Sequence, residues 1–72
     1  MISQTAEYAL RAIVFLGGHV GRPATTRQIA ATTKVPVGYL SKVLQSLGKA
    51  GLVDAQRGLH GGYVLARSLD DL

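Results

Sequence analysis

The feature that most constrains the fold is a proline placed between two helical segments. In "TTRQIAATT", Thr25 can cap a helix, and Gln28 three residues later completes a capping box. Pro36 then interrupts the chain, because it lacks an amide hydrogen and biases Val35 away from helical backbone angles. A proline is nonetheless favourable at the start of a new helix, and the apolar residues of 37–50 recur with the period of an α-helix. The sequence therefore predicts a short helix, a tight turn and a longer helix.

The longer helix has an apolar side and a basic side. Its apolar residues recur at steps of three and four and predict an inner stripe of Leu40, Val43, Leu44 and Leu47. Lys42, Ser46 and Lys49 fall on the outer side. Gly51, directly after this segment, predicts where the helix ends.

The segment "SQTAEYALRAIVFLGG" predicts another amphipathic helix at the start of the chain. Ser3 is its expected N-cap, and Glu7 and Arg11 form an i,i+4 pair on its polar side. Its expected buried side consists of Ala6, Ala9, Leu10, Ile13, Val14 and Leu16. The glycine pair at 17 and 18 is expected to supply the left-handed residue that ends it.

Glycine-rich "RGLHGG", residues 57–62, can be a phosphate-binding loop, a hairpin tip or a flexible linker. Before it, "LVDAQ" has the period of two typical of a strand, and after it "YVLA" is rich in strand-favouring residues. The phosphate-binding spacings GxGxxG and GxxxxGK are absent, and the loop does not begin a helix. A hairpin tip is therefore the favoured interpretation.

The sequence as a whole predicts a mainly helical winged helix-turn-helix over residues 1–72: three helices and a small β-hairpin. The tail "RSLDDL" adds the signals of a fourth helix, because Ser68 can cap it and Asp70 and Asp71 are acids in its first turn. Since no helix body follows, we interpret the chain as one domain from a longer protein.

Charge and composition narrow the possible partners. The net charge is +4, and the segment from Arg22 to Arg67 contains seven basic residues and one acidic residue, Asp54. Such a block is typical of a polyanion partner, although charge alone equally fits a solvated surface. The chain has no cysteine, which excludes disulfides and thiolate metal sites built from it alone and fits a cytoplasmic protein. Its apolar runs are too short for a membrane span.

A helix-turn-helix of this layout predicts binding to double-stranded DNA, with its second helix in the major groove and its hairpin, the wing, on the minor groove or phosphates. The first turn of that helix offers Tyr39, Ser41 and Lys42 as hydrogen-bonding groups. His60, counted as neutral at pH 7, is expected to offer a hydrogen bond rather than a charge. The candidate DNA-binding residues are Thr26, Arg27, Pro36, Gly38, Tyr39, Ser41, Lys42, Lys49, Arg57, His60 and Gly61.

Three stretches carry a family resemblance. "EYALRA", "IAATTKVPVGYLSKVLQSLGKAGLV" and "RGLHGGYVLA" together resemble the bacterial regulators typified by IscR, NsrR and CymR. The resemblance implies a homodimeric transcriptional regulator of palindromic DNA, with a dimerisation helix and sensing cysteines beyond the wing. By this resemblance, the residues that recognise DNA in the family correspond to Pro36, Gly38, Tyr39, Ser41 and Lys42. The wing corresponds to Arg57 and the glycine loop. Gly38 stands where a serine is common, and His60 where glycine or asparagine is frequent.

Some of these relatives bind an iron-sulfur cluster, and the resemblance implies one here only if cysteines lie beyond residue 72. An acid in the first helix ligates the metal in some of them, and Glu7 lies at about that position. With no cysteine in the chain, a surface acid paired with Arg11 is the favoured interpretation.

Other functions are less well supported. Catalysis would use His19 or His60 as acid and base, but no nucleophile with a positioned base is evident. The two histidines have no ligand spacing for a metal. Tyr8 and Tyr63 are interpreted as core or edge aromatics rather than a base-stacking platform. A winged helix used for protein contacts is the main alternative, and the basic outer stripe argues against it.

Overall fold

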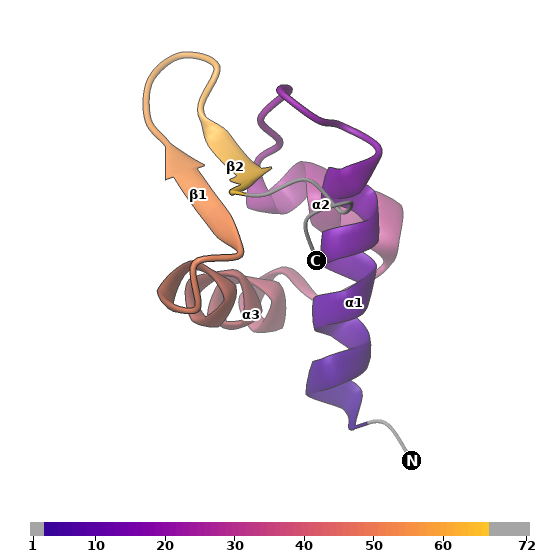
Figure 1. Cartoon of the computed structure of the whole chain (residues 1–72). Coiled ribbons are helices and arrows are strands. Elements are labelled where there is room, and N and C mark those ends of the chain that lie inside the picture. The colour runs from indigo at the N-terminus through magenta and orange to yellow at the C-terminus, as the bar shows by residue number, and fades with distance from the viewer. Residues whose placement is uncertain (1–2, 67–72) are drawn as a thin grey trace.

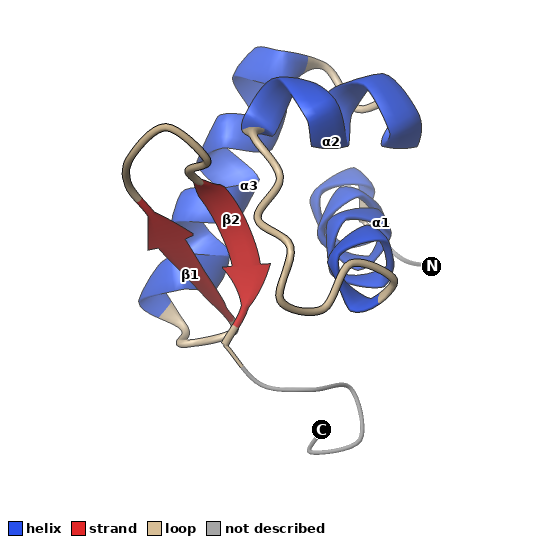
Figure 2. Ribbon diagram, turned by 90° about the horizontal axis from the view of Figure 1, so that it is seen from above, coloured by secondary structure: helices blue, strands red, loops and turns tan. Residues whose placement is uncertain are grey.

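The computed structural model describes residues 3–66, which form three helices and a two-stranded hairpin (Figure 1). The elements are α1 (Gln4–Gly17), α2 (Thr26–Thr33), α3 (Val37–Lys49), β1 (Val53–Gln56) and β2 (Gly62–Leu65). The hairpin lies against α3, and α1 closes the other side of the bundle (Figures 1 and 2). This order confirms the winged helix-turn-helix expected from the sequence. The expected fourth helix at Ser68 lies outside the described residues.

Local signals account for the helix-turn-helix. The capping box is confirmed, because Thr25 Oγ1 accepts a hydrogen bond from Gln28 N–H at 3.1 Å and Gln28 Oε1 accepts one from Thr25 N–H at 2.8 Å. Lys34 ends α2 in the left-handed region, with a φ of 64°, and its N–H donates to the carbonyl of Ala30. Pro36 then stands at the N-cap of α3. The turn between α2 and α3 therefore consists of Lys34, Val35 and Pro36.

The core lies where the three helices meet the base of the hairpin. The predicted inner stripe of α3 is confirmed, because its four apolar residues are all buried. The buried cluster consists of Ala12, Leu16, Ala24, Ile29, Ala30, Val35, Leu40, Val43, Leu44, Leu47 and Val53. Tyr8 and Tyr63 are partly buried against it, as expected for core-edge aromatics.

The expected buried side of α1 is wrong in part. Leu10 and Val14 are 51% and 67% exposed, and Ala6 is exposed as well. The buried residues of this helix are Ala12 and Leu16. Ala12 is 0% exposed, although a hydrophobicity pattern ranks alanine below leucine. The inner side is therefore rotated toward Ala12.

The expected end of α1 is also wrong in its geometry. Gly18 has a φ of −82°, so no left-handed residue ends the helix. Its N–H instead donates to the carbonyls of Val14 and Phe15. The positive φ lies three residues later, at Gly21 with 75°, where the connector to α2 changes direction. At the end of α3, by contrast, the predicted stop at Gly51 is confirmed, and this glycine has a positive φ, at 79°.

The hairpin is anchored to the connector between α1 and α2, which the sequence did not predict. β1 and β2 pair antiparallel, with Val53 opposite Leu65. On the other edge of β2, Ala24 forms an isolated bridge with Tyr63, as Figure 2 shows where the connector runs beside β2. A Cβ on Gly62 would lie 2.5 Å from backbone atoms of Ala24, so the close approach requires glycine there. The wing is thus joined to the connector between α1 and α2 as well as to the end of α3.

Candidate nucleic-acid interface

The outer face of α3 carries an exposed row of small, polar and basic side chains. Gly38, Lys42 and Ser46 are exposed and follow one another at four-residue steps, which places them on one side of a helix. Lys49 continues this side to the end of α3 and is also exposed. The inner stripe buries the opposite side, so the core fixes which residues α3 presents to solvent.

A hollow of about 420 Å³ lies at the start of this row, between α1 and α3. We call it the α1–α3 hollow, and it is lined by Thr5, Gly38, Tyr39, Lys42, Val43 and Ser46. It brings together Gly38, Tyr39 and Lys42 from the predicted site. Ser46 was placed on the outer side by the helical period but not among the contact residues. Thr5 was missed, because no spacing links it to a helix more than thirty residues away.

Tyr39 is held by the first turns of α1. Its hydroxyl and that of Thr5 share a hydrogen bond at 2.5 Å, and either can be the donor. Its ring meets that of Tyr8 edge to face, with centroids 5.2 Å apart. Gln4 Nε2 donates to the Tyr8 hydroxyl at 2.9 Å, and the Arg11 guanidinium lies over the Tyr8 ring. The side chain of Tyr39 is therefore fixed by α1 as well as by its own helix.

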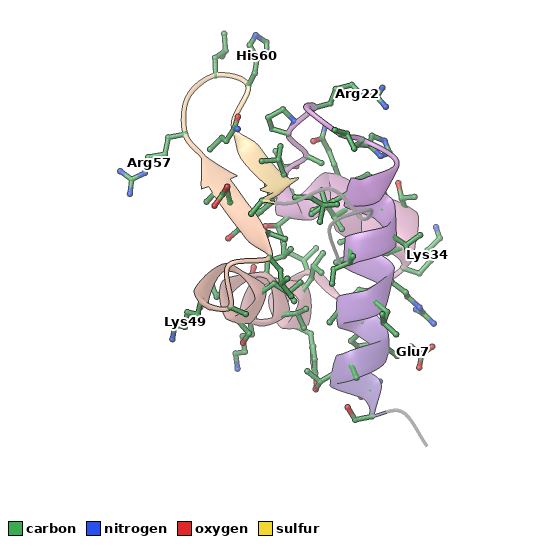
Figure 3. All side chains as sticks on the ribbon, in the orientation of Figure 1. Glu7, Arg22, Lys34, Lys49, Arg57 and His60 are labelled. Atoms are coloured by element: carbon green, nitrogen blue, oxygen red, sulfur yellow. The ribbon has the colours of Figure 1, made fainter. Side chains whose placement is uncertain are left out.

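The wing places Arg57 and His60 in solvent. Figure 3 shows His60 at the tip and Arg57 projecting from the start of the loop, on the same side of the molecule as Lys49. Leu59, between them, is 94% exposed. His60 and Gly61 also line a hollow of about 330 Å³ with Arg22 and neighbouring residues of the connector and α2. The loop therefore faces solvent on its outer side and the connector on its inner side.

The remaining predicted contact residues lie elsewhere. Arg27 and Pro36 are exposed and line a separate hollow between α2 and the start of α3. Thr26 and Ser41 are half-buried. The predicted residues thus occupy separate regions, and Gly38, Tyr39 and Lys42 are the ones that line the α1–α3 hollow.

Basic side chains outnumber acidic ones in the part of the chain that the structure describes. Residues 3–66 contain two acids, Glu7 and Asp54, against seven basic residues. Glu7 is neutralised by Arg11, whose guanidinium lies 2.7 Å from its carboxylate in the predicted i,i+4 pair. In Figure 3 Glu7 projects from the edge opposite Lys49 and Arg57. The outer face of α3 is therefore basic, and the wing carries both Arg57 and the exposed acid Asp54.

The described residues do not provide the ligands of an iron-sulfur cluster. The chain contains no cysteine, and the Glu7 carboxylate is engaged with Arg11. Within residues 3–66 no three His, Cys, Asp or Glu side chains are grouped to hold a metal ion. His19 has a structural setting, because its ring stacks on Phe15 and its Nδ1 lies 2.8 Å from the Phe15 carbonyl oxygen.

No helix in this part of the chain has the length and apolar character that a membrane span requires.

Comparisons with known proteins agree with the fold. A family model described as "Rrf2: Iron-dependent Transcriptional regulator" matches residues 2–72. The HTH-type transcriptional regulator NsrR of Geobacillus kaustophilus is 37% identical over 67 residues, which cover 92% of this chain and 46% of that protein.

Solved structures give the same result. The structure of T. potens IscR matches with a TM-score of 0.94 at 36% identity, covering 100% of this chain and 53% of that one. The structure of CymR, described as the global cysteine regulator of B. subtilis, matches with a TM-score of 0.93 at 34% identity, covering 100% of this chain and 57% of that one. The chain thus spans about half the length of these proteins.

Proposed function

The chain belongs to the Rrf2 family of transcriptional regulators, and on that premise we propose that it is a sequence-specific DNA-binding domain. The observation that carries this proposal is the exposed outer face of α3. Lys42 and Lys49 lie on it, Arg57 projects from the wing on the same side, and Glu7 faces away. A basic helix face beside an arginine at the wing complements the phosphates of a duplex.

In this proposal α3 enters the major groove and the wing meets the minor groove or the phosphates. An arginine such as Arg57 suits a narrow minor groove, where the negative potential is enhanced. Gly38 leaves the start of α3 without a side chain, which permits close approach of this helix to the DNA. The half-buried Ser41 offers a hydroxyl from the same turn.

We further propose that the full protein acts in the cytoplasm as a homodimer on palindromic DNA. A two-fold symmetric regulator of this fold contacts two half-sites about one helical turn, or a multiple of it, apart. Selection of duplexes from a random pool by the full-length protein should therefore return inverted repeats. Single, asymmetric sites among the selected duplexes would contradict the dimer.

The direct test of DNA binding is a titration of a fluorescent duplex at several salt concentrations. The logarithm of the association constant should fall linearly with that of the salt concentration, with a slope of about −0.9 for each phosphate contacted. Circular dichroism on the same sample reports that the domain is folded. A folded domain that shows no binding at low salt would contradict the proposal and favour a winged helix that contacts proteins.

A further inference from the structure

We propose that the α1–α3 hollow binds one phosphate of the DNA backbone, so that the first turn of α1 is part of the interface. This inference rests on the proposed function and names the chemical group that this part of the surface recognises. Three observations carry it: the access that Gly38 provides, the kind of polar group around the hollow, and the hydroxyl pair that α1 contributes.

Gly38 opens the hollow. A Cβ built at this position would meet no atom within 4 Å, so the space beside it is free. Val43, which forms part of the lining, is 4% exposed and gives the hollow a fixed apolar wall. A ligand that approaches α3 from solvent can therefore reach the backbone of its first turn without displacing a side chain.

The polar side chains around the hollow are a cation and three hydroxyl groups. Lys42 contributes an ammonium group, and Ser46, Thr5 and Tyr39 contribute hydroxyls. None of the six lining residues is acidic. In the part of the chain that the structure describes, the side chains of Lys42 and Ser46 have no ion pair or hydrogen bond. A set of this kind favours an anion whose oxygens only accept hydrogen bonds, as those of a phosphodiester do.

The Thr5–Tyr39 pair supplies a positioned donor. Two hydroxyl groups carry two hydrogens, and the bond between them uses one. Within residues 3–66 neither hydroxyl has another hydrogen-bond partner, so the second hydrogen is available for an outside acceptor. The edge-to-face contact with Tyr8 holds the Tyr39 ring, and thereby this donor, in place. Such preorganisation lowers the entropic cost of binding.

The position of the hollow favours a phosphate over a base edge. The hollow lies between α3 and α1, because α1 contributes Thr5 to its lining. A helix packed beside the recognition helix stays outside the groove, where the sugar-phosphate backbone lies. Base edges lie at the floor of the groove, whereas Tyr39 is bonded to another helix at the side of α3. We accordingly assign Tyr39 to the backbone instead of to base reading.

The test uses the 72-residue chain and a duplex that it selects from a random pool. Single phosphates are replaced in turn by uncharged methylphosphonates, and the dissociation constant is measured for each duplex. One replacement should weaken binding of the wild-type chain by about tenfold, the effect of losing a charge-assisted hydrogen bond. At that same position the replacement should have a smaller effect on Lys42→Gln, on Ser46→Ala and on the double variant Thr5→Val/Tyr39→Phe, because each of them has already lost part of the phosphate's partners.

Lys49→Gln is the matched control, because it removes the same charge from the other end of α3. In Lys49→Gln, methylphosphonate replacement at this phosphate should weaken binding as much as in the wild-type chain. Replacement at a different phosphate should weaken it less. Ser46→Ala keeps the test valid if the double variant is unstable, because the site is exposed and alanine favours a helix.

Two results would overturn the phosphate site. One is that no phosphate has a smaller effect in these variants than in the wild-type chain. The other is that replacing guanine by 7-deazaguanine, which removes a base acceptor, has a smaller effect in the double variant Thr5→Val/Tyr39→Phe, whereas no methylphosphonate does. In both cases the wild-type chain still binds the duplex, so DNA binding stands and only the phosphate site fails. A wild-type chain that does not bind would instead contradict the proposed function itself.

Discussion

The backbones of Tyr63 and Ala24, 39 positions apart in the chain, exchange two hydrogen bonds. Tyr63 N–H donates to the Ala24 carbonyl at 2.7 Å, and Ala24 N–H donates to the Tyr63 carbonyl at 3.1 Å. Tyr63 also lies opposite Ala55 in the hairpin. The wing is thereby joined to the α1–α2 connector as well as to the end of α3, and Gly62 makes the close approach possible.

Gly62→Ala is expected to destabilise the domain by about 3 kcal/mol. The new Cβ would lie 2.5 Å from the Ala24 backbone, and Gly62 has a φ of 148°. Overpacking costs about 1–3 kcal/mol, and strain at such a φ adds a similar amount. Urea unfolding followed by circular dichroism measures the loss.

Gly58→Ala is the control for this variant. Gly58 also has a positive φ, 113°, but a Cβ there would meet no atom within 4 Å. It should cost only the backbone strain, about 1–2 kcal/mol. Equal losses in the two variants would show that the contact with Ala24 does not restrict Gly62.

Leu16→Ala and Leu10→Ala should differ strongly. Leu16 is 1% exposed in the core, so its truncation should cost about 2–5 kcal/mol. Leu10 is 51% exposed, so the same change should cost less than about 1 kcal/mol. Thermal and urea unfolding of both variants check this. A larger loss for Leu10→Ala would indicate that the helix buries the side that its hydrophobic pattern first predicted.

Thr25→Ala should destabilise the domain by about 1 kcal/mol, within the range of 0.5–2 kcal/mol known for lost N-caps. The threonine oxygen accepts from Gln28 N–H, which has no partner within its own helix. Thr25→Ser keeps the acceptor and should recover most of the stability, measured by urea unfolding. An unchanged midpoint of urea unfolding in Thr25→Ala would mean that water replaces the N-cap hydrogen bond without loss of stability.

Lys49→Gln should weaken binding to all duplex sequences alike and lower the magnitude of the salt slope by about 1, because it removes one phosphate contact. Lys34→Gln removes the same charge from the opposite edge of the molecule (Figure 3) and should leave the slope unchanged. Both variants are titrated with a selected and a random duplex. A change of preference between the two duplexes in Lys49→Gln would assign it to base reading.

Much of the fold and part of the candidate site follow from the sequence alone. The capping box at Thr25, the interruption at Pro36 and the stop at Gly51 are signals between residues close in the chain, so the lengths and order of α2 and α3 could be predicted. The apolar period of α3 fixed its inner side, and with it the outer position of Lys42 and Lys49. The glycines of the wing indicated a turn because few other residues adopt its backbone angles.

Only the tertiary structure decided how these elements meet. The side of α1 that is buried depends on how α2 and α3 pack against it. A hydrophobicity pattern of α1 alone does not contain this information. The bond between Thr5 and Tyr39 and the bridge between Ala24 and Tyr63 join residues more than thirty positions apart. Such contacts leave no local signal in a single sequence, because they arise from the packing of whole elements. The sequence therefore determined the helices and the wing, and packing determined the hollow beside α3 and the anchor of the wing.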